Sequence, residues 1–136
     1  MRDPDCLFCK IVAGELPSQR IAEDERTVSF MDINPATRGH ALVIPKAHAV
    51  NLLEIEPDDL AAVALAAQQL AKRVPERLGA DGVNLLNSCG AAAWQTVFHL
   101  HVHVVIPRYA DDPLRLPWTP APGDADEIAD AASALR

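Results

Sequence analysis

A chain of 136 residues has the length of one compact domain and leaves little room for a second. Hydrophobic residues make up 49% of it and aromatic residues only 4%, which predicts a closely packed aliphatic core. The 12 basic and 19 acidic side chains give a formal net charge of −7, and this argues against nucleic acid or an anionic membrane as a partner, because both require a basic surface. A small phosphorylated ligand is still compatible with a local polar site on an acidic protein.

The first third of the chain predicts a short helix followed by three strands. Between Cys6 and Ala13 the apolar side chains recur at helical spacing, and Gly14 and Pro17 end the helix. Two β-like segments with an acidic turn between them come next, and the apolar run ALVIP then reads as a buried strand closed by Pro45. The three predicted strands are Arg20–Glu23, Thr27–Asp32 and residues 41–45.

The middle of the chain predicts one long amphipathic helix over residues 57–74. Its apolar side chains recur every three or four residues, Pro57 stands at a favourable first position, and acidic residues occupy the first turn. Pro75 is expected to end or kink this helix, because proline lacks the N–H that continues the helical ladder. Two more strands are predicted after it, at Gly82–Asn87 and Val97–Ile106.

The last part of the chain differs in composition. Five prolines between residues 107 and 122 exclude regular structure there, and residues 124–135 predict a short Ala-rich helix beyond them. We therefore expect a domain over residues 1–112 and a proline-rich tail over residues 113–136. Because strands follow one another around one long helix, the predicted fold class is α+β with a mainly antiparallel, five-stranded sheet.

The sequence predicts neither export nor a membrane-spanning segment. The N-terminal sequence MRDPDC lacks the basic and apolar regions of a signal peptide, and no stretch approaches 18 uninterrupted apolar residues. The three cysteines, Cys6, Cys9 and Cys89, are an odd number, which disfavours a secreted disulfide framework. In a reducing compartment a Cys-x-x-Cys pair is typical of a metal or redox site. The sequence therefore predicts a cytoplasmic protein.

The histidines of the segment HLHVHVV are the strongest chemical signal. His99, His101 and His103 alternate, and alternate side chains of a strand share one face, so the three imidazoles are expected on one side of the sheet. Two chemistries fit this pattern. Three histidines can bind a catalytic zinc with an open fourth position, or one histidine can attack phosphorus while its neighbours bind phosphate and transfer protons. The spacing alone leaves both open.

Four further elements surround this triplet. They are Cys6-x-x-Cys9, the segment DINP at residues 32–35, the segment GHALVIPKAH at residues 39–48, and QTVF at residues 95–98. Together with the triplet they resemble the histidine triad (HIT) superfamily over residues 6–108, and most closely the bacterial zinc-containing members of its Hint-like branch. The resemblance implies a HIT-type fold, with a five-stranded antiparallel sheet, one long helix and a short N-terminal helix. It also implies a homodimer.

The function that the resemblance implies is hydrolysis at the α-phosphate of purine nucleoside phosphoramidates or related nucleotides. His101 matches the family nucleophile, which forms a nucleotidyl-histidine that water then releases. An imidazole suits this role, because its reference pKa of about 6.5 leaves much of it unprotonated near neutral pH. His103 matches a residue that contacts the phosphate or the leaving group, Thr96 a hydroxyl that relays a proton, and His40 a residue that supports the triad through hydrogen bonds.

The resemblance also implies contacts to each part of the nucleotide. Asp32 matches the carboxylate that accepts hydrogen bonds from the ribose hydroxyls. The residues that match an apolar slot for the base are Phe8, Ile11, Phe30 and Ile33. Those that match phosphate ligands are Asn87, Gln95 and Thr96, beside His101 and His103. Neutral amides and hydroxyls can stabilise an anion when they are aimed at it in a pocket of low dielectric constant.

A second site that the resemblance implies is a structural zinc. Cys6, Cys9, His48 and His99 match the positions that bind it in some bacterial relatives. Two cysteines and two histidines form a closed tetrahedral shell, which is the structural rather than the catalytic pattern. His99 would then be structural, and His101 and His103 would be left for the chemistry. No organic cofactor is expected.

Three other functions are alternatives to hydrolysis of nucleoside phosphoramidates. The alternatives are a dinucleoside-polyphosphate hydrolase of the Fhit type, a nucleotidyltransferase with the same covalent step, and a nucleotide-binding scaffold with incidental activity.

The sequence departs from the family pattern at Trp94, which stands where relatives often have a glycine before the glutamine. A bulky residue adopts unusual backbone angles less easily than glycine, so we expect the phosphate loop to differ in shape.

Overall fold

The computed structural model describes residues 3–99 and 104–136. It confirms the α+β class and the five-stranded sheet, in which every pair of neighbouring strands is antiparallel. The elements, in chain order, are α1 (Leu7–Val12), β1 (Arg20–Glu23), β2 (Thr27–Met31), β3 (Ala41–Pro45), α2 (Pro57–Leu78), β4 (Gly82–Leu86), the short 3₁₀ helix η1 (Ala91–Ala93), β5 (Val104–Arg108) and α3 (Ala125–Leu135).

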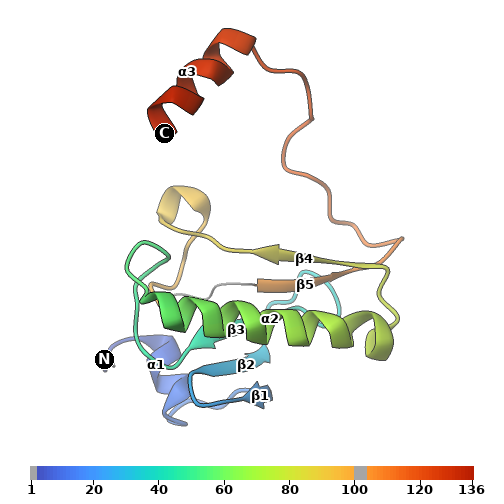
Figure 1. The fold of residues 1–136 in the computed structure, drawn as a ribbon. Helices are drawn as coiled ribbons and strands as arrows, with labels where there is room; N and C mark the ends of the chain where they lie inside the picture. Colours follow the sequence, from blue (N-terminus) through green and yellow to red (C-terminus); the bar gives the residue numbers. More distant parts are fainter. Residues whose placement is uncertain (1–2, 100–103) are drawn as a thin grey trace.

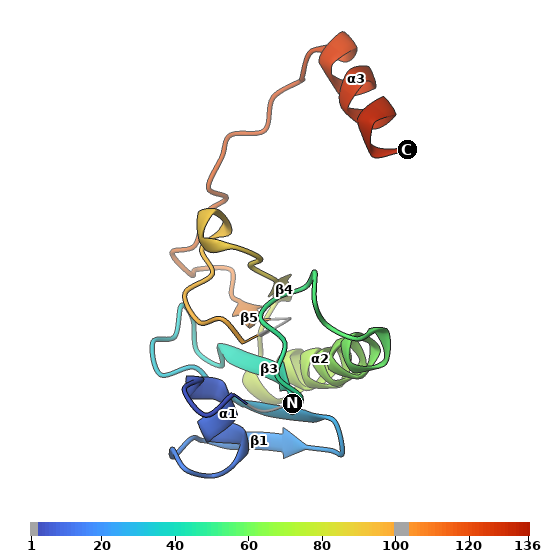
Figure 2. The ribbon, with the colours of Figure 1, turned by 90° about the vertical axis from the view of Figure 1, so that its left-hand side faces the viewer.

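The sheet has the order β1-β2-β3-β5-β4 and carries a helix on each face. Figures 1 and 2 show α2 lying along one side of the sheet and α1 on the other. The middle strand β3 is buried throughout, and its side chains alternate between the two layers. Ala41 and Val43 belong to the core under α2, whereas Leu42 and Ile44 belong to the core under α1.

Helix α2 covers the sheet with one apolar stripe. Val63, Ala67, Leu70 and Val74 are buried at three- and four-residue spacing and pack on the strands. The helix continues past Pro75 to Leu78, so proline does not end it. Pro75 lies in the last turn, where only one helical hydrogen bond is lost. Gly79, in the left-handed conformation, then ends the helix, and its N–H donates to the Pro75 carbonyl (3.1 Å).

Helix α1 builds a smaller core on the opposite face. Phe8, Cys9 and Ile11 are buried against side chains of β2 and β3. The rings of Phe8 and Phe30 meet edge to face, with centroids 5.7 Å apart. This short helix would not be stable alone, so it depends on these contacts and on the cysteines at its start.

The predicted strand Val97–Ile106 differs from the structure at both ends. Residues 97–99 form a bend, and the strand on the described part of the chain runs from Val104 to Arg108. Here Gln95 bonds to Val50 and His99 to Pro45, the last residue of β3, and alternation of residue types cannot show such distant partners. The strand passes through Pro107, which pairs with Val83 of β4 but lies beyond the two residues paired with β3.

The proline-rich tail is irregular up to α3, the predicted Ala-rich helix. Asp124 caps this helix by accepting a hydrogen bond from the Glu127 N–H (3.0 Å). None of its residues is buried, and Figure 1 shows it standing apart from the sheet. Within the described ranges, none of the helices combines the length and apolar character needed to cross a bilayer. A domain boundary at residue 112 stays a prediction.

Candidate functional site

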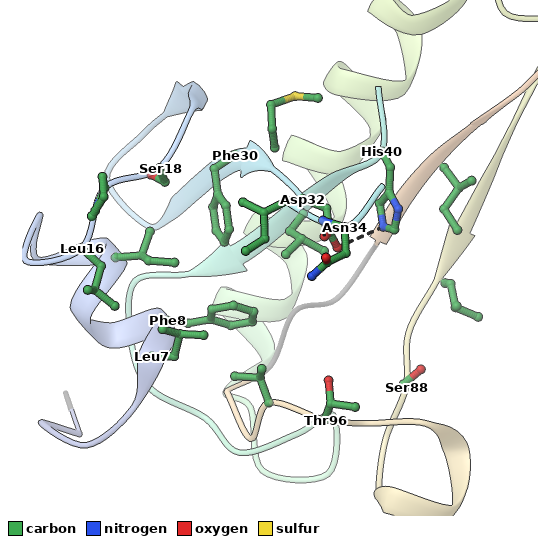
Figure 3. A pocket seen from close by; sticks show the side chains of 18 of the residues that line it. Leu7, Phe8, Leu16, Ser18, Phe30, Asp32, Asn34, His40, Ser88 and Thr96 are labelled. Carbon is green, nitrogen blue, oxygen red and sulfur yellow. Dashed lines mark hydrogen bonds and ion pairs between the residues drawn. The ribbon is translucent and has the colours of Figure 1, made fainter. Parts of the chain in front are cut away.

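A cavity of about 530 Å³ opens between α1, the end of β2 and the loop that follows β4. Figure 3 shows its two unlike ends. Leu7, Phe8, Leu16 and Phe30 form an apolar end next to α1, and the hydroxyls of Ser88 and Thr96 lie across from them. The remaining described residues that line it are Ile11, Pro17, Ser18, Met31, Asp32, Ile33, Asn34, His40, Leu42, Leu86, Trp94, Val97 and Ile106.

A carboxylate and an imidazole lie together on the wall between these ends. Asp32 follows β2, and its Oδ1 accepts a hydrogen bond from the Asn34 N–H (2.7 Å). Its Oδ2 lies 3.4 Å from Nε2 of His40, which stands immediately before β3. The turn that carries His40 includes Gly39 at φ +93°, where a side chain would clash with Leu78. The fold therefore fixes both groups at the ends of neighbouring strands.

The hydrogen bonds of His40 define its protonation. Its Nδ1 accepts from the Ala36 N–H (2.9 Å), so the proton of the neutral ring is on Nε2. That Nε2 is buried and makes no hydrogen bond to any described residue, because its approach to Asp32 lacks the required geometry. Burial lowers the pKa of His40, and the Asp32 carboxylate opposes this shift. Burial therefore favours the neutral imidazole at this wall, with its Nε2–H directed at the Asp32 carboxylate.

The loop between β4 and the histidine triplet is held by a buried glutamine. Gln95 accepts a hydrogen bond from the Gly90 N–H (2.7 Å) through Oε1 and donates through Nε2 to the carbonyls of Val50 (2.7 Å) and Val97 (3.1 Å). Its side chain is only 4% exposed, so the amide is engaged within the protein. The loop thereby brings Thr96 to the cavity wall.

A second cluster of functional side chains lies under α1. Cys6, Cys9, His48 and His99 place their sulfur and nitrogen atoms within 4.8 Å of one another. The two Nδ1 atoms are 3.2 Å apart, and His99 Nδ1 is 3.4 Å from each sulfur. Cys9 Sγ is 3.3 Å from His48 Nδ1. The four predicted metal-site residues, up to 93 positions apart in sequence, are therefore brought together.

These distances fit one tetrahedral zinc ion. Bonds of about 2.3 Å to sulfur and about 2.05 Å to nitrogen separate two nitrogen ligands by about 3.3 Å and a sulfur from a nitrogen by about 3.6 Å. The ring of His99 is also oriented for this role. Its Nε2 donates to the Pro45 carbonyl (2.9 Å), which leaves the Nδ1 lone pair facing the cluster. The residues present therefore fit a closed structural metal site.

The structure brings together some of the predicted nucleotide-binding residues and separates others. Those that line the cavity are Phe8, Ile11, Phe30, Asp32, Ile33, His40 and Thr96. Asn87 and Gln95 are not among the lining residues, and His101 and His103 lie outside the described residues. The structure adds Asn34, which the DINP segment contains but which was given no role, and Ser18 and Ser88, which lie in none of the motifs.

Comparison with known proteins identifies the family. The HIT domain model matches residues 13–111. The chain belongs to the HIT family. Among relatives, a HIT-like protein of Mycobacterium tuberculosis is 44% identical over 78% of this chain and 74% of its own length. The adenylylsulfatase HINT3 of Arabidopsis thaliana is 41% identical over 79% of this chain, which spans 54% of that protein.

Solved HIT structures have the same fold. SMU.412c from Streptococcus mutans superposes with a TM-score of 0.91 at 40% identity, covering 98% of this chain and 84% of its own. A Zn-bound histidine triad protein from Mycobacterium smegmatis gives 0.78 at 42% identity, covering 96% and 97%. A histidine triad nucleotide-binding protein from Candida albicans gives 0.83 at 34% identity, covering 96% and 94%. The HIT-type fold is therefore confirmed.

The buried neutral His40 predicts a specific dependence of stability on pH. Its folded-state pKa lies below that of the unfolded chain, about 6.5, so the unfolded state binds more protons as the pH falls below that value. We expect the free energy of unfolding to decrease more steeply in the wild type than in His40→Asn, which keeps an acceptor for Ala36 but does not titrate. Urea unfolding between about pH 7.5 and 5.5 measures both slopes. Equal slopes would contradict the assignment.

Proposed function

We propose that this protein hydrolyses purine nucleoside phosphoramidates or related nucleotides at the α-phosphate, through a covalent nucleotidyl-histidine. The observation that carries the proposal is the cavity beside α1. The cavity is apolar at one end, has Asp32 on its wall and has hydroxyls at the other end. His99, the first residue of the histidine triplet, follows Thr96 by three residues. The nucleotide-binding relative of Candida albicans and the Arabidopsis adenylylsulfatase support an adenylate-type substrate.

Each part of a nucleotide has a place along this cavity. The base enters the apolar end, where Phe8 and Phe30 already meet edge to face. The Asp32 carboxylate, whose Oδ1 is held by the Asn34 N–H, accepts from the ribose hydroxyls. Thr96 then lies at the phosphate end with Ser88. Asn87, the neighbour of Ser88, is proposed as a further phosphate ligand although it is not among the residues that line the cavity, and Gln95 acts by holding the loop that presents Ser88 and Thr96.

The proposed reaction has two displacements at phosphorus. An imidazole nitrogen of His101 attacks the α-phosphorus, a P–N bond to the ring forms, and the bond to the leaving amine breaks. The amine departs with a proton supplied through Thr96 or His103. Water then attacks the same phosphorus, the histidine is released, and the nucleoside monophosphate leaves. Two displacements predict retention of configuration at phosphorus.

The covalent step is tested by mass spectrometry with adenosine 5′-phosphoramidate. We expect early quenching under conditions that preserve phosphoramidate bonds to reveal an adenylated protein, most abundant in His103→Ala, which turns over slowly. His101→Ala should form no adduct and lose turnover by on the order of 10³-fold or more, because the nucleophile is absent.

Four other outcomes would each favour a different function. Substrate consumption without an adduct, stopped by a chelator, would favour a catalytic metal. Tight nucleotide binding without adduct or turnover would favour a binding scaffold. Much faster cleavage of a dinucleoside polyphosphate than of the phosphoramidate would favour the Fhit-type hydrolase, and transfer of the nucleotide to an acceptor other than water would favour a nucleotidyltransferase.

We also propose that Cys6, Cys9, His48 and His99 hold a structural zinc ion. Support comes from the tetrahedral spacing of their ligand atoms and from the Zn-bound relative of Mycobacterium smegmatis. The ion would join the start of α1 to the segment after β3 and to the first residue of the histidine triplet. Its contribution is to stability and to the shape of the apolar end, since the Phe8 ring packs against His99 with centroids 5.9 Å apart. Reduced thiols of this kind agree with the proposed cytoplasmic location.

Elemental analysis of the purified protein tests the zinc proposal. We expect one zinc per chain in the wild type and none in Cys9→Ser, with the free energy of unfolding lowered by at least about 1–3 kcal/mol, the cost of unsatisfied buried polar groups. Cys89→Ser is the matched control, because Cys89 is outside the cluster. A catalytic zinc would instead be revealed if the remaining folded Cys9→Ser molecules had no turnover.

We further propose a homodimer formed through the face that carries α2. Leu65 on α2 and Leu85 on the edge strand β4 are 59% and 47% exposed, and β4 pairs only with β5 among the described strands. An open edge with exposed leucines is a surface that another chain can cover. Sedimentation equilibrium should give about twice the 14.7 kDa of one chain, and the double variant Leu65→Glu, Leu85→Glu should be a folded monomer. A monomeric wild type would contradict the proposal.

A further inference from the structure

Trp94 combines an exposed indole with an unusual backbone conformation. It is the one non-glycine residue with positive φ on the described part of the chain, at φ 72° and ψ 17°. A bulky side chain rarely adopts this left-handed conformation, because its Cβ crowds the backbone. The indole is nevertheless 66% exposed, so burial of the ring in a core does not explain why it is held there.

The loop around Trp94 enforces this conformation. The N–H groups of Trp94 and Gln95 donate to the carbonyls of Ala91 and Gly90, both at 3.1 Å. Oε1 of Gln95 accepts from the Gly90 N–H, and its Nε2 bonds to Val50, which fixes the loop to the rest of the protein. Residues kept in strained conformations by their surroundings cluster at functional sites. The loop therefore fixes the backbone position from which the indole projects.

Because Trp94 lies on the loop that also carries Ser88 and Thr96, we place it at the end of the cavity proposed for the phosphate. Trp94 lines the same cavity as Thr96 and Ser88, whose hydroxyls lie across from the apolar residues of α1 (Figure 3). If the base occupies the apolar end and the phosphate lies at Thr96, the group attached beyond the phosphate extends toward the loop of residues 88–96. The indole is then the largest apolar surface available to that group.

We infer that Trp94 selects the leaving group by stacking on it, and that the preferred substrates are nucleoside phosphoramidates whose amine carries a planar aromatic ring. This inference rests on the proposed function. Offset stacking on an indole favours a flat ring over a puckered ring of equal size. The part of the chain described here places no lysine or arginine on the cavity wall, so apolar contact rather than charge distinguishes one leaving group from another at this end.

Two matched substrates test this selectivity. Adenosine 5′-phosphoramidates of 2-phenylethylamine and 2-cyclohexylethylamine have the same linker and carbon count, but only the first has a planar ring. We expect the wild type to prefer the phenyl compound by roughly 3- to 10-fold in kcat/KM, the usual gain from an aromatic pair. The ratio should fall to about one in Trp94→Leu and be retained in part in Trp94→Phe.

A third variant separates selectivity from stability. Trp94→Gly removes the side chain and also relieves the left-handed strain, so its thermal midpoint should be no lower than that of the wild type while its ratio falls to about one. An unchanged ratio in Trp94→Leu and Trp94→Gly would overturn the inference. So would an equal loss of kcat/KM on both ring compounds and on the unsubstituted phosphoramidate, because the indole would then contact the nucleotide itself.

Failure of the proposed function gives a different result. If the wild type hydrolyses none of these compounds, the same pair is compared by equilibrium binding, using the fluorescence of Trp94 in a Trp118→Phe background. If the phenyl compound binds more tightly, and competition measurements show that Trp94→Leu loses this preference, the stacking role holds without the reaction. Equal affinity of the two compounds would overturn it.

Discussion

The short strand β3 is the element on which both functional clusters depend. All five of its residues are buried, and their alternation joins the core under α2 to the core under α1. His40 immediately precedes the strand, and its last residue, Pro45, accepts the hydrogen bond that orients His99. His48 follows three residues later. Because this strand pairs with β2 and β5 and is buried on both faces, its position fixes the cavity wall and the metal-binding geometry together.

Local patterns predicted most of the fold because most elements obey them. The stripe of α2 and the alternation of the strands are repeated over enough residues to reveal which face is buried. The prediction failed where distant groups compete with a local pattern. Alternating histidines predicted a strand from Val97 onward, but the ring of His99 bonds to Pro45 and approaches the cysteines, and residues 97–99 bend instead. Pro75 did not end α2, which continues to Leu78, and a kink at this residue stays a prediction.

The candidate site was predictable in composition but not in contacts. The motifs of the family pointed to residues that the fold brings together, four of them in one Cys/His cluster and seven on the cavity wall, and their roles there stay predictions. Gln95 shows what a motif leaves out. Its amide could serve a phosphate, yet in the structure it is buried and bonded to Gly90, Val50 and Val97. Partners 45 residues apart have no local signature, so the supporting role of this side chain emerges only from the fold.

The charge of the molecule constrains how such a cavity can hold an anion. The chain has a net charge of −7, and the described cavity wall contains a carboxylate but neither lysine nor arginine. On the described part of the wall, an anion would therefore be held by neutral donors acting at short range. Such donors are effective only when their positions are fixed before the ligand arrives. Three side chains of this region are preorganised at an energetic cost. Gln95 is a buried amide, Trp94 has a strained backbone, and burial lowers the pKa of His40.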